Sequence, residues 1–223
     1  MASRNRGNPL ALAVLVCLSE RPMHPYEVST VLRQRAKHES VRLNYGSLYA
    51  VVGALERRGL IVAKETERAG RLPERTIYDV TDAGLVEMHE WLSDLLSTPV
   101  KDYPSLEAAL SFLAALPPDE VVDLLGERAR RLEFELAHVS ATRELVERHR
   151  LPRLFWVESE FQMVLRRAEL GYVRQLRDEI ARGQLEGIEW WRTVHEHPDR
   201  PPPDPFVDPV ATAEQLASPT DHA

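Results

Sequence analysis

A short polar and aromatic stretch, Asn44–Tyr49 (NYGSLY), carries residue types that can contact a nucleic acid. Asn, Ser and Tyr offer hydrogen-bonding tips, Gly46 lets a backbone approach closely, and the next acidic residue is Glu56. If a helix begins here, its first turn also presents unpaired N–H groups and a partial positive charge. Such a helix end suits phosphate contact and the reading of base edges in a major groove. The alternative is that the tyrosines only pack and that Ser47 only caps the helix.

The residues that follow predict the helix that would position this stretch, over about 45–58. Four apolar residues recur at helical spacing and form one face: Leu48, Val51, Val52 and Leu55. Gly59 stands where many helices end, and two arginines precede it, near the negative helix end. The predicted helix therefore has a polar front and a rear that packs on a core.

Flanking patterns predict a winged helix-turn-helix around this helix. Pro9 opens a predicted helix over 10–19, and Pro25 opens another over 25–36, in which Tyr26 is expected to pack. Two β-branched and aromatic runs, 60–66 and 76–81, predict a β-hairpin with a charged loop. Its basic side chains stand where a wing straddles a sugar-phosphate backbone: Lys64, Arg68, Arg71 and Arg75. The alternative is a merely solvated loop, since nearby glutamates dilute its charge.

The rest of the chain predicts an all-α domain with long helices, so the fold class is mainly α. The expected helices are 81–97, 106–116, 118–149 and 153–183, with a short helical turn at 185–195. Ser105 is expected to cap the second of them. Apolar seams on the two long helices predict a pair within one chain or a bundle with a second chain. The residues assigned to a dimer interface are Leu125, Leu132, Leu136, Phe161, Leu165, Tyr172 and Leu176.

Charge is divided unevenly along the chain, whose total is −7 at pH 7. Residues 1–83 hold 13 Lys and Arg against 9 Asp and Glu, a net +4, whereas residues 84–223 hold 15 against 26, a net −11. A basic front and an acidic rear suggest two modules with different partners, and DNA would repel the rear. The predicted domains are 1–81, 82–197 and a proline-rich, disordered tail, 198–223.

The sequence gives little support to membrane, metal or catalytic roles. The longest apolar run, Leu10–Leu18, is shorter than the roughly 20 residues of a membrane span, and it has no signal-peptide cleavage pattern. We therefore expect no membrane partner and a cytoplasmic location. There is no glycine-rich phosphate loop or nucleophile elbow, and His195 and His197 lack an obvious third metal ligand. We expect no enzyme, no metal and no cofactor.

Several large aromatic residues could form a binding site for a small aromatic or hydrophobic effector. Such residues are more often plain core, but a group of them can line a cavity between the domains or at a dimer seam: Trp91, Trp156, Trp190, Trp191, Phe112, Phe155 and Phe161. A ligand there would act only if it bound two conformations of the protein unequally.

Four stretches resemble the PadR family of transcriptional regulators: 10–28, 44–61, 76–84 and 116–128. The family pattern of three short motifs is present at Met23-His24-Tyr26-Glu27, Gly46-Leu48-Tyr49 and Tyr78-Thr81-Gly84. Pro25 departs from that pattern, because the family usually has glycine there. The resemblance covers about residues 9–185 and does not include the proline-rich tail.

The resemblance implies a homodimeric winged-helix repressor whose long C-terminal helices pack across a two-fold axis. Its partners would be double-stranded DNA with a palindromic operator, a second copy of the chain, and a small molecule. The recognition-helix contacts would be Asn44, Tyr45, Gly46, Ser47 and Tyr49. The alternative is a winged-helix module that binds another protein without specific DNA binding, which the negative total charge favours.

Overall fold

The computed structural model describes residues 8–67, 75–148 and 150–199, and for residues 65–67, 75 and 141–147 only the backbone. These residues fall into two compact units, which meet in the chain between Asp102 and Tyr103. The first unit thus extends past the predicted boundary at residue 81, because the next helix packs on its core. Within the described ranges, no helix is long and apolar enough to span a membrane.

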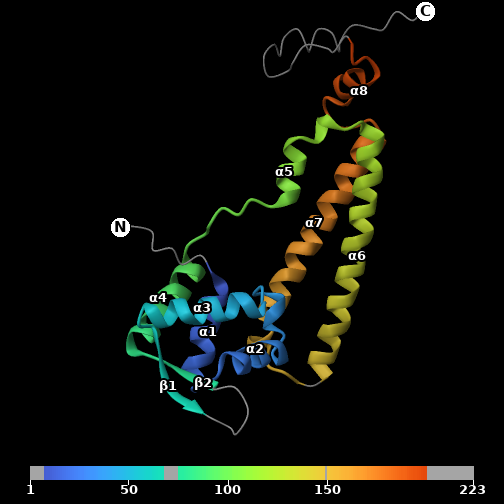
Figure 1. The fold of residues 1–223 in the computed structure, drawn as a ribbon. Helices are drawn as coiled ribbons and strands as arrows, with labels where there is room; N and C mark the ends of the chain where they lie inside the picture. The colour runs from blue at the N-terminus through green and yellow to red at the C-terminus, as the bar shows by residue number, and fades with distance from the viewer. Residues whose placement is uncertain (1–7, 68–74, 149, 200–223) are drawn as a thin grey trace, which may run out of the picture. The chain divides into compact units, whose positions relative to one another are not determined.

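The first unit is a three-helix core with a two-stranded hairpin and a fourth helix (Figure 1). Its elements are α1 (Pro9–Glu20), α2 (Pro25–Gln34), the 3₁₀ turn η1 (Lys37–Glu39), α3 (Tyr45–Arg57), β1 (Ile61–Glu67), β2 (Arg75–Val80) and α4 (Asp82–Ser97). This order confirms the predicted winged helix-turn-helix.

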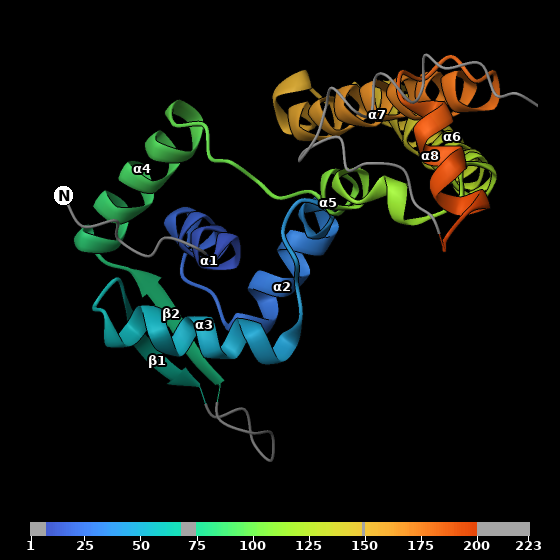
Figure 2. The same cartoon turned by 90° about the horizontal axis from the view of Figure 1, so that it is seen from above.

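Helix α1 is the centre of this unit (Figure 2). Asn8 caps it, since its Oδ1 accepts a hydrogen bond from the N–H of Leu10 at 3.1 Å, and Pro9 takes the first turn. Seven of its residues are buried, and Val14 and Leu15 have no exposed surface. An apolar helix of this kind can only be accommodated with neighbours on several sides, and α2, α3, α4 and β2 all contact it.

The hairpin β1–β2 is antiparallel, and a bulge interrupts its register at Lys64. A third short pairing, which the sequence patterns did not indicate, joins it to the turn between α1 and α2. The backbone N–H and C=O groups of Met23 and Tyr78 pair reciprocally, at 3.0 Å each. The hairpin is thereby anchored at the turn that precedes α2.

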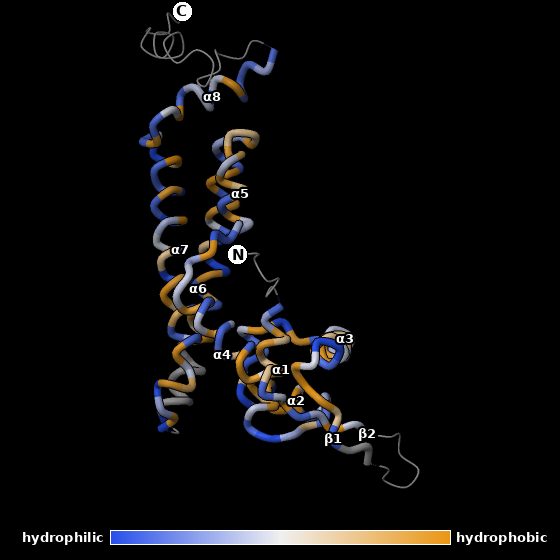
Figure 3. The backbone as a smooth tube through the Cα atoms, turned by 90° about the vertical axis from the view of Figure 1, so that its left-hand side faces the viewer, coloured by the Kyte–Doolittle hydropathy of each residue, from blue (hydrophilic) through white to orange (hydrophobic). Residues whose placement is uncertain are grey.

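The second unit is all helical and consists mainly of two long helices that pack side by side (Figure 1). Its elements are α5 (Ser105–Ser111), η2 (Leu113–Ala115), α6 (Pro118–Arg148), η3 (Arg153–Phe155), α7 (Val157–Ala181) and α8 (Ile188–Glu196). Apolar and polar segments alternate along α6 and α7 in Figure 3, as a one-sided apolar seam requires. Their shared core contains Val121, Leu125, Ala129, Leu132, Leu170, Val173, Leu176 and Ile180.

Two details of the predicted helices are wrong. Ser105 is the first residue of α5 and not its cap; Pro104 occupies that position and makes no side-chain cap bond. The predicted helix 106–116 ends at Ser111 and continues only as the 3₁₀ turn η2, and the predicted helix 153–183 likewise begins as a 3₁₀ turn, η3. The tail, from residue 200 on, lies outside the described residues.

The predicted interface residues divide into two groups. Leu125, Leu132 and Leu176 are buried in the chain's own α6–α7 core, and Leu136 packs against that core. Phe161, Leu165 and Tyr172 are exposed on α7, by 62%, 52% and 52%. The second group is therefore exposed in the single chain, and the assignment of all seven residues to a dimer interface stays a prediction.

The large aromatics are divided between the two units. Trp91 belongs to the core of the first unit and Trp191 to that of the second, where its Nε1 donates to the carbonyl oxygen of Leu116 at 2.8 Å. Phe112 and Phe155 are more than half exposed. His195 also serves the fold, since its Nε2 lies 2.9 Å from the carbonyl oxygen of Ala114. In the described part of the chain, no three His, Cys, Asp or Glu side chains cluster as metal ligands.

Candidate nucleic-acid interface

The first turn of α3 is built by Asn44. Its backbone is extended, and its Oδ1 accepts a hydrogen bond from the N–H of Ser47 at 2.7 Å. Asn44 is therefore the N-cap, and the alternative that Ser47 merely caps the helix is wrong. The Ser47 hydroxyl is left on the exposed surface of the first turn.

The front of α3 divides sharply into a covered and an open side. Leu48 has no exposed surface and lies in the core of the first unit. Tyr45 and Tyr49 are 44% and 50% exposed, and Gly46 and Ser47 are also exposed. The residues singled out from the sequence thus share one open surface, on which the helix also presents its positive end.

The two tyrosines of this surface are held by side chains of the preceding helix. Tyr26 stacks on Tyr45, with 6.3 Å between ring centroids and 10° between ring planes. The guanidinium carbon of Arg33 lies 5.1 Å from the centre of the Tyr45 ring, a cation–π distance. His24 meets Tyr49 edge-on at 6.4 Å. The rings are therefore oriented before any partner arrives.

Tyr26 corrects one prediction. The sequence patterns placed it in the packing face of α2, but it is 59% exposed and belongs to this aromatic cluster. His24 has the role of N-cap of α2, since its Nδ1 accepts from the N–H of Tyr26 at 3.1 Å. Helical spacing did not reveal either role, although both residues stand in the motif at 23–27.

The rear of α3 is fixed by two backbone hydrogen bonds and one ion pair. Gly59 has φ +68°, and its N–H donates to the carbonyl oxygen of Glu56. The N–H of Leu60 donates to the carbonyl oxygen of Leu55, and the two bonds together make a Schellman motif. Arg58 then donates to Glu87 of α4 at 2.8 Å, and Glu87 is only 7% exposed. The open front of α3 is thus carried on a rigid support.

The wing is only partly described. Lys64, at the bulge in β1, pairs with Asp79 of β2 at 2.5 Å, so its charge is partly satisfied within the hairpin. Arg75 begins β2, and only its backbone is described. Arg68 and Arg71 lie outside the described residues. The assignment of these four residues to DNA contact stays a prediction.

The comparison with protein families decides the type of this domain. Residues 14–90 match the sequence model of the transcriptional regulator PadR-like family. Residues 14–90 are thus a PadR-like domain. The match includes α3, the hairpin and most of α4, so the exposed surface described above belongs to the PadR-like domain. A search of curated protein sequences finds no significant match.

Solved structures share the fold of the PadR-like domain and of much of the second unit. Bacillus subtilis PadR in complex with operator DNA is 17% identical, with a TM-score of 0.63, and the match covers 78% of this chain and 99% of that one. PadR from the same organism in complex with p-coumaric acid is 15% identical, with a TM-score of 0.59, over 77% and 98%. The Vibrio cholerae virulence activator AphA is 16% identical, with a TM-score of 0.58, over 77% and 98%.

Proposed function

We propose that this protein is a sequence-specific DNA-binding repressor that acts as a homodimer and leaves its operator when a small molecule binds. The observation that carries the proposal is the open first turn of α3. Oriented tyrosines, a serine hydroxyl and a glycine surround the positive end of that helix, while Leu48 anchors it to the core. A helix end of this kind fits the major groove, with backbone and side-chain groups for phosphates and short polar tips for base edges.

The proposed contacts on α3 are Asn44, Tyr45, Gly46, Ser47 and Tyr49, and those of the wing are Lys64, Arg68, Arg71 and Arg75. Wing arginines would bind phosphates and thus contribute affinity without discrimination. The complex of B. subtilis PadR with operator DNA supports DNA as the partner class.

A homodimer is supported by the exposed apolar side of α7. Phe161, Leu165, Ala168 and Tyr172 are exposed there, and they follow one another at spacings of four, three and four residues. This is the repeat of a helix that packs along another helix. Since one winged helix neutralises few phosphates, we expect two of them to bind a palindrome whose half-sites are about 34 Å apart, or a multiple of that distance.

Release by a small molecule is supported by the PadR structure that holds p-coumaric acid. Such a ligand would act by binding the DNA-competent and the released conformation with unequal affinity. We propose repression and not activation because the resemblance to the family implies a repressor.

A gel shift with the full chain tests the proposal. The probe is the DNA upstream of the chain's own gene, and a scrambled duplex of equal length and composition is the control, both at physiological salt. We expect the upstream DNA to bind more tightly, with an affinity that falls steeply as salt rises. Equal binding of both duplexes would support the protein-binding alternative, and a footprint over a single asymmetric half-site would contradict the homodimer.

A further inference from the structure

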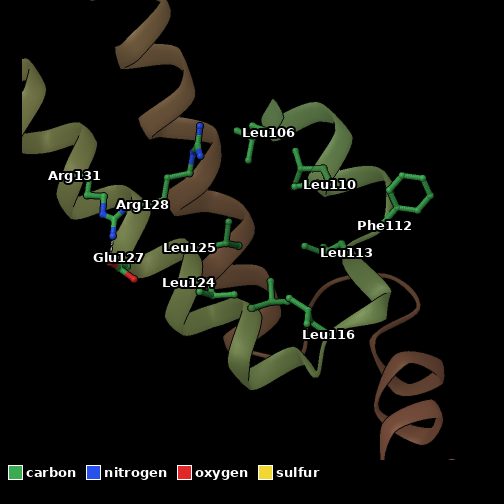
Figure 4. Close-up of a pocket in the computed structure, with 12 residues that line it drawn as sticks. Leu106, Leu110, Phe112, Leu113, Leu116, Leu124, Leu125, Glu127, Arg128 and Arg131 are labelled. Atoms are coloured by element: carbon green, nitrogen blue, oxygen red, sulfur yellow. Dashed lines mark hydrogen bonds and ion pairs between the residues drawn. The ribbon is translucent and has the colours of Figure 1, made fainter. Parts of the chain in front are cut away.

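An aliphatic pocket opens in the second unit, between α5–η2 and the first turns of α6 (Figure 4). Its volume is about 300 Å³, at the lower end of the range for small-molecule sites. Six leucines line it: Leu106, Leu110, Leu113, Leu116, Leu124 and Leu125. Phe112 stands at its edge, but its side chain is 76% exposed and points away from the leucines. The walls are therefore aliphatic, without an aromatic face for ring stacking.

Charged side chains stand at one end of the pocket: Glu127, Arg128 and Arg131. Arg131 pairs with Glu127 one helical turn away, and the two side chains are 74% and 47% exposed. An exposed pair of this kind is weak, so a ligand anion can compete for Arg131. Arg128 donates from Nε and Nη2 to Oε1 of Glu169, and a guanidinium has further N–H donors besides these.

We propose that this pocket binds a straight-chain alkyl carboxylate of medium length. The alkyl chain would lie among the leucines, and the carboxylate would bind the guanidinium of Arg131, with Arg128 beside it. Each arginine already faces one glutamate, Arg131 the exposed Glu127 and Arg128 the less exposed Glu169. The ligand carboxylate would therefore displace Glu127 from Arg131, because a planar guanidinium matches a carboxylate with two parallel hydrogen bonds. Binding itself is independent of DNA. Any use of this ligand as the effector would rest on the proposed function.

Calorimetry with the full chain in the absence of DNA tests the site. The probes are hexanoate, octanoate and decanoate, each below its micelle-forming concentration. We expect the dissociation constant to fall about four-fold for each methylene that finds room, since each one buried carries the usual hydrophobic free energy. The heat-capacity change should be negative. Octanol and octylamine should bind at least ten-fold more weakly than octanoate.

Three variants locate the site. Leu124→Glu places a carboxylate among the leucines at a position that is already 46% exposed, and it should weaken octanoate binding at least ten-fold. Ala137→Glu makes the same charge change at an exposed position on α6 outside the pocket, and it should bind octanoate as the unmodified protein does. Arg131→Gln should keep the dependence on chain length but lose the preference for octanoate over octanol.

Several results would overturn the proposal. One is that none of the acids binds, and another is that the affinity does not change with chain length. A third is that Leu124→Glu and Ala137→Glu weaken octanoate binding equally. If the acids do not bind and Leu124→Glu separates a dimer in sedimentation, the pocket is a contact between two copies of the chain. A scrambled duplex that binds as well as the upstream DNA would defeat the proposed function but leave these calorimetric results intact.

Discussion

Substitution of Gly46 by alanine separates what α3 needs as a helix from what it needs as a surface for DNA. Gly46 does not adopt a positive φ angle, so its backbone suits any residue. A Cβ atom added there would have Asn44 Oδ1 as its nearest neighbour, at 3.9 Å, an ordinary van der Waals contact. The folded chain therefore has no need of glycine at this position.

Gly46→Ala should change protein stability and DNA affinity in opposite directions. Alanine is preferred to glycine in a helix by roughly 0.5–1 kcal/mol, which should raise the melting temperature of a chain of this size by about 1–4 °C. If the backbone of α3 lies against the groove, the added methyl group would overpack that contact at a cost of about 1–3 kcal/mol. This corresponds to roughly 5- to 150-fold weaker binding. Gly46→Ala should thus make the protein more stable and a poorer DNA binder.

Thermal unfolding followed by circular dichroism measures the first effect, and fluorescence anisotropy with labelled operator measures the second. Gly53→Ala is the matched control, because it lies on the same helix beyond the first turn. An added Cβ there would meet only the flexible end of Arg57, at 3.4 Å. Gly53→Ala should leave DNA affinity unchanged. If Gly46→Ala binds operator as tightly as the unmodified protein, the first turn of α3 does not approach DNA closely and our reasoning is refuted.

Three further predictions concern the fold and the assembly. Gly84→Ala should destabilise the protein by about 1–3 kcal/mol or more in urea unfolding. The reason is that a Cβ atom there would lie 2.0 Å from the carbonyl oxygen of Leu60 and 2.7 Å from the Val80 side chain. An unchanged urea midpoint of unfolding would contradict that close packing. Burial raises the pKa of the Cys17 thiol to about 11, so the reactive thiolate is scarce at pH 8. A disulfide reagent should therefore label Cys17 only after unfolding. Prompt labelling of the folded protein would refute this prediction. Leu165→Glu should convert the proposed dimer to a monomer in analytical ultracentrifugation, and a dimer of unchanged stability would exclude α7 as the seam.

The helices of the first unit could be predicted because their signals are local. Pro9 and Pro25 open α1 and α2, and Gly59 ends α3, each by a backbone preference that is independent of the rest of the fold. The aromatic cluster was missed for the opposite reason. Tyr26 meets Tyr45 only because two helices cross there, and periodicity within one helix carries no information about that crossing.

The second unit shows where an apolar pattern becomes ambiguous. A seam near a 3.5-residue period fits a helix pair within one chain as well as a pair between chains. Leu125 and Leu132 were predicted at an interface between chains, and they are buried in the α6–α7 core of the single chain. Ser105 resembles a cap by residue type, but the helix begins one residue earlier than that assignment requires. In both cases a short pattern does not identify the segment on which it packs.

The central claim is that the open first turn of α3 reads DNA sequence. The most direct test is the ratio of the dissociation constants for scrambled and operator DNA, measured for the unmodified protein and for Ser47→Ala. Loss of one hydrogen bond to a base should reduce the ratio by roughly 2- to 12-fold, through weaker operator binding alone, while affinity for scrambled DNA stays constant. An unchanged ratio, or equal weakening on both duplexes, would contradict the claim.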